Sequence, residues 1–69
     1  MIELTQMQHY PQKNTWKEKP ISVNAYRVES VAIDFREGNT VITFGKDDFI
    51  VVKESYGYVL GKMKEILND

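Results

Sequence analysis

Short runs of β-branched and aromatic residues, separated by turn residues, fill the last two thirds of the chain and lead into one amphipathic segment. Three runs with strand character lie at residues 31–35, 40–44 and 49–53. Connections of about four residues, each containing a glycine, join them, and such connections suit β-hairpins. The pattern predicts an antiparallel meander in a small β-rich module, and it is not the pattern of an enzyme.

The N-terminal third has weaker strand signals. Residues 2–5 alternate apolar and polar side chains, and the alternation restarts at residues 21–23, which predicts two further strand segments. Residues 24–27 interrupt the alternation and are predicted as a turn or corner. The intervening residues 6–20 are polar and contain two prolines, which are unfavourable in helices and central strands. We predict a loop or a long, edge-type hairpin arm there.

The C-terminal segment has the features of a short helix. Ser55 is suited to the N-cap position, and apolar side chains then recur at helical spacing: Val59, Met63 and Ile66. Gly57 and Gly61 each cost about 1 kcal/mol relative to alanine inside a helix, so packing against the sheet must hold the helix. These glycines are either tolerated on a surface helix or allow another backbone to approach closely.

Together these segments predict one domain over residues 1–69, because a chain of this length supports one core at most. The expected fold is mainly β (α+β): a small bent antiparallel sheet, or partly open barrel, of about four strands with one C-terminal helix. The expected core is Ile2, Leu4, Val23, Val31, Ile33, Ile42, Phe44, Val52, Val59, Met63 and Ile66. Phe35, Phe49 and Val51 are assigned to the opposite face, although a one-residue register slip would exchange the faces.

Composition excludes several classes of partner. The net charge is −1, from nine basic and ten acidic residues, so no global field attracts nucleic acid or an anionic membrane. The chain has no cysteine, and no apolar run approaches the roughly 20 residues that a spanning helix needs. Direct membrane insertion is therefore not expected. The N-terminus lacks the features of a signal peptide, which predicts a cytoplasmic location.

The sequence offers few residues for catalysis. His9 is the single histidine, whereas structural zinc takes about four nitrogen or sulfur ligands. A nucleophile activated by His9 would also need an orienting carboxylate and an oxyanion hole, and the spacing indicates neither. Asp47 and Asp48 are typical turn residues. We therefore predict no catalytic residue, no cofactor and no metal.

Residues 6–20 contain the best binding candidates, because aromatic side chains alternate there with lysines. The favoured reading is a protein contact, with self-association into a homo-oligomer, since aromatic residues are enriched in interfaces. Its anchors would be Tyr10, Trp16, Phe35 and Phe49. The alternative is a small β-barrel nucleic-acid-binding regulator of phage or mobile-element origin, in which aromatics stack on bases and lysines contact phosphates. Its contacts would be Lys13, Trp16, Lys17 and Lys19.

Five short motifs resemble the FlbD family of small bacterial proteins associated with flagellar and swarming motility. They are Met1–Thr5, Ile21–Asn24, Val28–Ile33, Thr40–Thr43 and Val51–Ser55, the last running into the predicted helix. The resemblance implies a non-enzymatic, protein-binding accessory of motility. The chain departs from that family at residues 6–20, because family members connect their first two strands through a few residues around an Asn-Gly turn.

Overall fold

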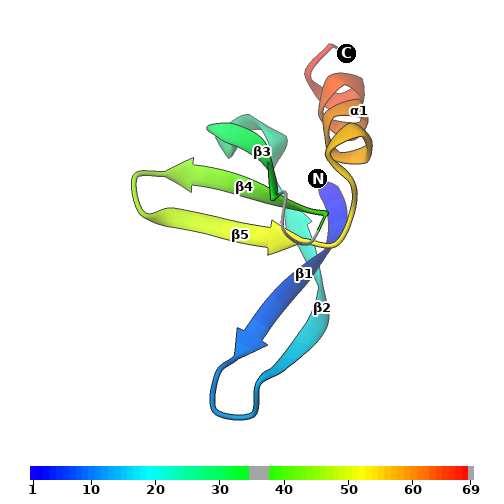
Figure 1. Cartoon of the computed structure of the whole chain (residues 1–69). Helices are drawn as coiled ribbons and strands as arrows, with labels where there is room; N and C mark the ends of the chain where they lie inside the picture. The colour runs from blue at the N-terminus through cyan, green and yellow to red at the C-terminus, as the bar shows by residue number, and fades with distance from the viewer. Residues whose placement is uncertain (35–37, 69) are drawn as a thin grey trace.

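The computed structural model describes residues 1–34 and 38–68 and shows an open, five-stranded antiparallel sheet with one C-terminal helix (Figure 1). The strand order is β2-β1-β5-β4-β3. The predicted mainly β fold is confirmed, in its open-sheet form. The elements are β1 (Ile2–Tyr10), β2 (Thr15–Val23), the 3-10 turn η1 (Ala25–Arg27), β3 (Ser30–Asp34), β4 (Asn39–Gly45), β5 (Asp48–Val52) and α1 (Tyr56–Leu67).

Residues 6–20 form a hairpin arm, which was one of the two structures predicted for them. β1 and β2 pair along their whole length, from Ile2 opposite Val23 to Tyr10 opposite Thr15. The loop at the tip contains Asn14 with a φ of 50°, in the left-handed region that asparagine tolerates better than most residues. The strand segments predicted at residues 2–5 and 21–23 are the ends of two longer strands, because the backbone of the polar arm between them is paired, and the sheet has five strands where about four are predicted.

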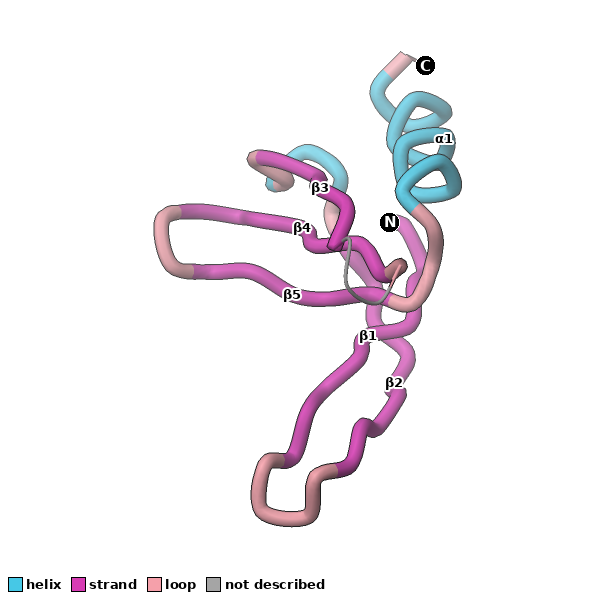
Figure 2. The backbone as a smooth tube through the Cα atoms, viewed as in Figure 1, coloured by secondary structure: helices cyan, strands magenta, loops and turns pink. Residues whose placement is uncertain are grey.

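The arm and the β4–β5 hairpin leave the centre of the sheet in different directions (Figures 1 and 2). β1 pairs with β5 through Gln6 opposite Val52, so the two hairpins share little of their length. The β4–β5 hairpin turns at Lys46 and Asp47, with Gly45 opposite Asp48. The resulting molecule is elongated, with extents of 43 × 23 × 22 Å.

The core lies between α1 and one face of the sheet, which we call the inner face. Its buried members are Ile2, Leu4, Val23, Ala25, Ile42, Val52 and Val59. Val31, Phe44, Met63 and Ile66 are partly buried against them, so most of the predicted core is confirmed. Ala25 was missed because it lies in η1, where the side chain of Asn24 accepts a hydrogen bond from the Tyr26 amide. Ile33 was wrongly assigned to the core, since it is 44% exposed on the edge strand β3.

A group of hydrogen bonds, which we call the junction, ties the root of the arm to the segment before α1. The Thr5 amide donates to Glu54 Oε1 at 2.8 Å, and the Lys53 amide donates to the Thr5 carbonyl at 2.8 Å. The buried Thr40 hydroxyl donates to the Glu54 carbonyl at 2.7 Å. Strands β1 and β4 are therefore both bonded to Glu54.

Helix α1 begins as predicted, because Ser55 Oγ accepts a hydrogen bond from the Tyr58 amide at 3.2 Å. A Cβ added at either helical glycine would meet no atom within 4 Å. Within residues 1–34 and 38–68, no backbone outside α1 lies close to Gly57 or Gly61, as expected for tolerated glycines on a surface helix.

Gly61→Ala is expected to stabilise the protein by about 0.5–1 kcal/mol, because alanine loses less conformational entropy in a helix and the new methyl group has space. Urea denaturation at a fixed protein concentration measures the change. Gly38→Ala is the control with the opposite expected sign, since Gly38 has a φ of 72°. A destabilised Gly61→Ala variant would show that this glycine faces another chain.

Candidate functional site

The strand pairing divides the sheet side chains between the inner face and an opposite, outer face. Successive residues of a strand point to opposite faces, and paired residues share a face. Leu4, Ile42 and Val52 are buried on the inner face. The side chains out of phase with them form the outer face, of which the apolar and aromatic members are Met7, His9, Trp16, Pro20, Ala32, Val41, Phe49 and Val51.

The outer face exposes an apolar surface that extends from the arm onto the β4–β5 hairpin. Trp16 is 47% exposed on the arm and Phe49 is 60% exposed on β5. Met7, Val41 and Val51 lie half-buried between them. Helix α1 packs on the inner face, where Val59 joins the core. A large apolar patch on a small protein usually marks a contact with another macromolecule, so the outer face is the candidate functional site.

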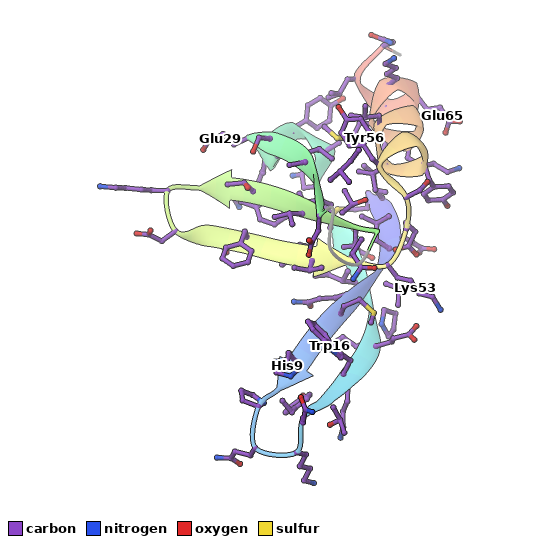
Figure 3. The ribbon with its side chains drawn as sticks, viewed as in Figure 1. His9, Trp16, Glu29, Lys53, Tyr56 and Glu65 are labelled. Atoms are coloured by element: carbon purple, nitrogen blue, oxygen red, sulfur yellow. The ribbon has the colours of Figure 1, made fainter. Side chains whose placement is uncertain are left out.

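The arm presents its aromatic residues in a defined pair. His9 is directly opposite Trp16, and their ring centroids are 4.7 Å apart with an interplanar angle of 37° (Figure 3). Such cross-strand aromatic pairs stabilise a hairpin and restrict its side chains. On the same side of the arm, Glu18 forms an exposed ion pair with Lys53 at 3.2 Å, which contributes little to stability because water screens it.

The structure brings together only part of the predicted protein contact. Trp16 and Phe49 share the outer face, as the protein-contact prediction requires. Tyr10 does not join them, because it lies next to His9 in β1 and points to the other side of the arm, where Lys17 Nζ lies 5.3 Å from its ring centroid. The fourth predicted anchor, Phe35, lies outside the described residues.

The four residues of the nucleic-acid alternative do not form one surface. Lys17 is opposite Gln8 and Lys19 is opposite Gln6, so both lysines point to the side of the arm away from Trp16. Lys13 lies in the loop at the tip. The phosphates next to a base stacked on Trp16 would therefore lie on the opposite side of the arm from Lys17 and Lys19.

Sequence reasoning missed Met7, His9 and Val41 as members of the outer face. Val41 belongs to a run in which every residue is β-branched or aromatic, so the run itself does not reveal which side chains face outward. Met7 and His9 were hidden in the polar segment. If the arm had been recognised as a strand, the alternation that puts Leu4 on the inner face would have put Met7 and His9 on the outer face.

Other surfaces offer little chemistry. Within residues 1–34 and 38–68, no group of three or more histidine or acidic side chains could hold a metal ion. A hollow of about 320 Å³ is lined by Arg27, Asp48 and Phe44 with residues 21–24. Among the described residues of its lining, one guanidinium and one carboxylate lie with a single hydroxyl, that of Ser22, and no histidine.

Among the described residues, no helix is long and apolar enough to cross a membrane. In comparisons with models of protein families, with curated proteins and with solved structures, nothing matches this chain.

Proposed function

We propose that this chain is a non-enzymatic protein-interaction module whose contact surface is the outer face. The observation that carries the proposal is the apolar surface shared by two hairpins, with an exposed aromatic residue on each: Trp16 and Phe49. Large aromatic side chains are the most frequent anchors of protein interfaces, because they bury much area at a small entropic cost. Hydrophobic patches of this kind are energetically costly in water unless a partner covers them.

The arm supports the same proposal. An isolated two-stranded hairpin is at best marginally stable in water, and this arm extends beyond the sheet with its root held at the junction (Figure 2). Residues 8–20 are all exposed. A protein partner packed on the arm would supply the packing contacts that a two-stranded ribbon lacks.

Site-directed photo-crosslinking in cells tests the proposal. A photoreactive phenylalanine analogue at position 49 or 16 is expected to give discrete protein adducts, because both positions lie on the contact surface. The control is position 26, since Tyr26 is 73% exposed on η1, away from the outer face. Adducts of equal yield at all three positions, or no adducts at positions 49 and 16, would contradict the proposal.

The resemblance to the FlbD family adds a proposed setting for this module, the motility apparatus of a bacterium. The support is the set of short motifs from Met1–Thr5 to Val51–Ser55. Deletion of the gene should then reduce swarming or swimming, and complementation with Phe49→Ser should restore it poorly. Unchanged motility after deletion would remove this setting and leave the interaction proposal intact.

The nucleic-acid alternative makes a separate prediction through the single tryptophan. Titration with short single-stranded and duplex nucleic acids is expected to leave the fluorescence of Trp16 unchanged, because the lysines and the ring lie on different sides of the arm. Phosphate contacts would instead make the logarithm of affinity fall by roughly 0.7–0.9 per phosphate for each tenfold rise in salt. A saturable change with that salt dependence would favour the alternative.

A further inference from the structure

We infer that the partner on the outer face is a second copy of this chain, with the arm of each copy lying on the β4–β5 hairpin of the other. The inference rests on the proposed function, because it names the occupant of the same surface. Area, charge and the placement of the two hairpins each support it.

The exposed area is larger than a compact monomer requires. The solvent-accessible surface is 5200 Å², whereas a compact protein of 8.1 kDa exposes about 4500 Å². The radius of gyration is 12.2 Å, compared with about 11 Å for a compact chain of this length. The excess of roughly 700 Å² is close to the area of about 800 Å² that each partner buries in a standard interface. One further copy is therefore sufficient to cover it.

The charges of the two turns favour contact between the tip of the arm of one copy and the β4–β5 turn of the other. The tip loop carries Lys13, whereas Lys17 and Lys19 point to the side of the arm away from Trp16. The β4–β5 turn carries Lys46, Asp47 and Asp48, a net charge of −1, next to Phe49. Tip against tip and turn against turn would each bring like net charges together. Tip against turn brings opposite charges to the rim of the apolar contact, where they guide association and orientation.

The shape of the molecule makes this contact intermolecular and reciprocal. Within one copy the arm and the β4–β5 hairpin point in different directions (Figure 1), so the arm cannot lie on its own turn. Each copy carries both elements, and a two-fold axis therefore satisfies two identical contacts at once. Trp16 of each copy then packs near Phe49 of the other, and the two outer faces stack as sheets do in a sandwich.

The first test is the mass of the full 69-residue chain in solution, measured by sedimentation equilibrium over a range of concentrations. We expect twice the monomer mass of 8.1 kDa at the higher concentrations. Trp16→Ala and Phe49→Ser should each weaken dimerisation at least about tenfold, since both residues are exposed anchors. Tyr26→Ser is the matched control and should dimerise like the wild type. A chain that stays monomeric, or equal losses in all three variants, would overturn the inference.

The second test determines whether the arm of one copy contacts the β4–β5 turn of the other. One variant reverses the charge of the arm tip by Lys13→Glu, and the other reverses the net charge of the β4–β5 turn by Asp47→Lys. Each alone should dimerise more weakly than the wild type, because like charges now face each other. Their equimolar mixture should form a heterodimer in which both arm–turn contacts are attractive again. Separate variants that dimerise normally, or a mixture that stays monomeric, would contradict the arm–turn arrangement.

Circular dichroism confirms that each variant is folded before its mass is measured. Lys13 and Asp47 both lie in turns outside the strand ladders, so neither substitution removes a ladder hydrogen bond. The crosslinking experiment separates the two proposals. A monomeric chain whose outer face crosslinks to a different protein would reject self-association and retain the proposed function, whereas a monomer without outer-face adducts would reject both.

Discussion

Ile42→Ala is expected to lower the free energy of unfolding by about 2–5 kcal/mol, the usual cost of truncating a buried isoleucine. Ile42 is 1% exposed and lies between Val31 and Ile50 in the sheet ladder. The methyl groups lost would leave a cavity beneath α1 that the paired strands cannot close. A domain of this length has a total stability of roughly 3–10 kcal/mol, so the expected loss removes a large part of the total free energy of unfolding.

Urea denaturation followed by far-ultraviolet circular dichroism measures this effect, at one protein concentration because self-association would add to the apparent stability. Ile33→Ala is the matched control. Both isoleucines are in the strand positions that point to the inner face, but Ile33 is 44% exposed. Its truncation should therefore lower the free energy of unfolding by less than about 1 kcal/mol. Similar losses for the two variants would show that β3 has a covered inner side, contrary to this structure.

Glu54→Ala is expected to destabilise the protein by about 1–3 kcal/mol, because it leaves the Thr5 amide without its acceptor at a part-buried position. The loss should concentrate at the root of the arm, where Thr5 lies. Hydrogen exchange at the Thr5 amide reports this local effect, and urea denaturation reports the global one.

Glu54→Gln separates the hydrogen bond from other roles of this residue. The amide oxygen of glutamine can still accept from the Thr5 amide, so this variant should retain most of the stability and the protection against exchange. If alanine and glutamine at this position behave alike, the Thr5–Glu54 bond does not hold the arm. Attachment of the arm must then come from the hydrogen bond between the Lys53 amide and the Thr5 carbonyl and from the β1–β5 pairing at Gln6 and Val52.

The parts of the fold that could be predicted from sequence are those with a strong local signal. The meander of β3, β4 and β5 follows from short β-branched runs and glycine-containing turns, and α1 follows from the cap at Ser55 and the apolar spacing after it. For residues 6–20, the sequence left two predicted structures, a loop or a hairpin arm. The outer side of the arm carries Met7, His9 and Trp16 among polar neighbours, and the tip loop separates them, so the hydrophobic period on either strand is too short to distinguish a paired ribbon from an irregular loop.

The sequence predicted some residues of the candidate site but not which of them lie on the same face. Exposed aromatics were recognised as anchors, and Phe49 and Val51 were assigned to the face opposite the core, where the structure places them. Which aromatics act together depends on the strand register. Tyr10 and Trp16 are on opposite sides of the arm because Trp16 pairs with His9, one residue before Tyr10. That pairing depends on how the tip loop sets the register, which the side-chain pattern does not reveal.

The sequence by itself therefore determined the class of fold, most of the core, the helix with its cap, and a composition with one histidine and no cysteine. These properties follow from local periodicity, composition and turn chemistry, which each segment carries independently of its neighbours. Only the tertiary structure decided that the arm is a paired ribbon, that Ile33 is exposed, and that Met7, Trp16, Val51 and Phe49 share an uncovered face. Those features depend on register and on the face that α1 covers, and both arise from contacts between residues distant in the chain.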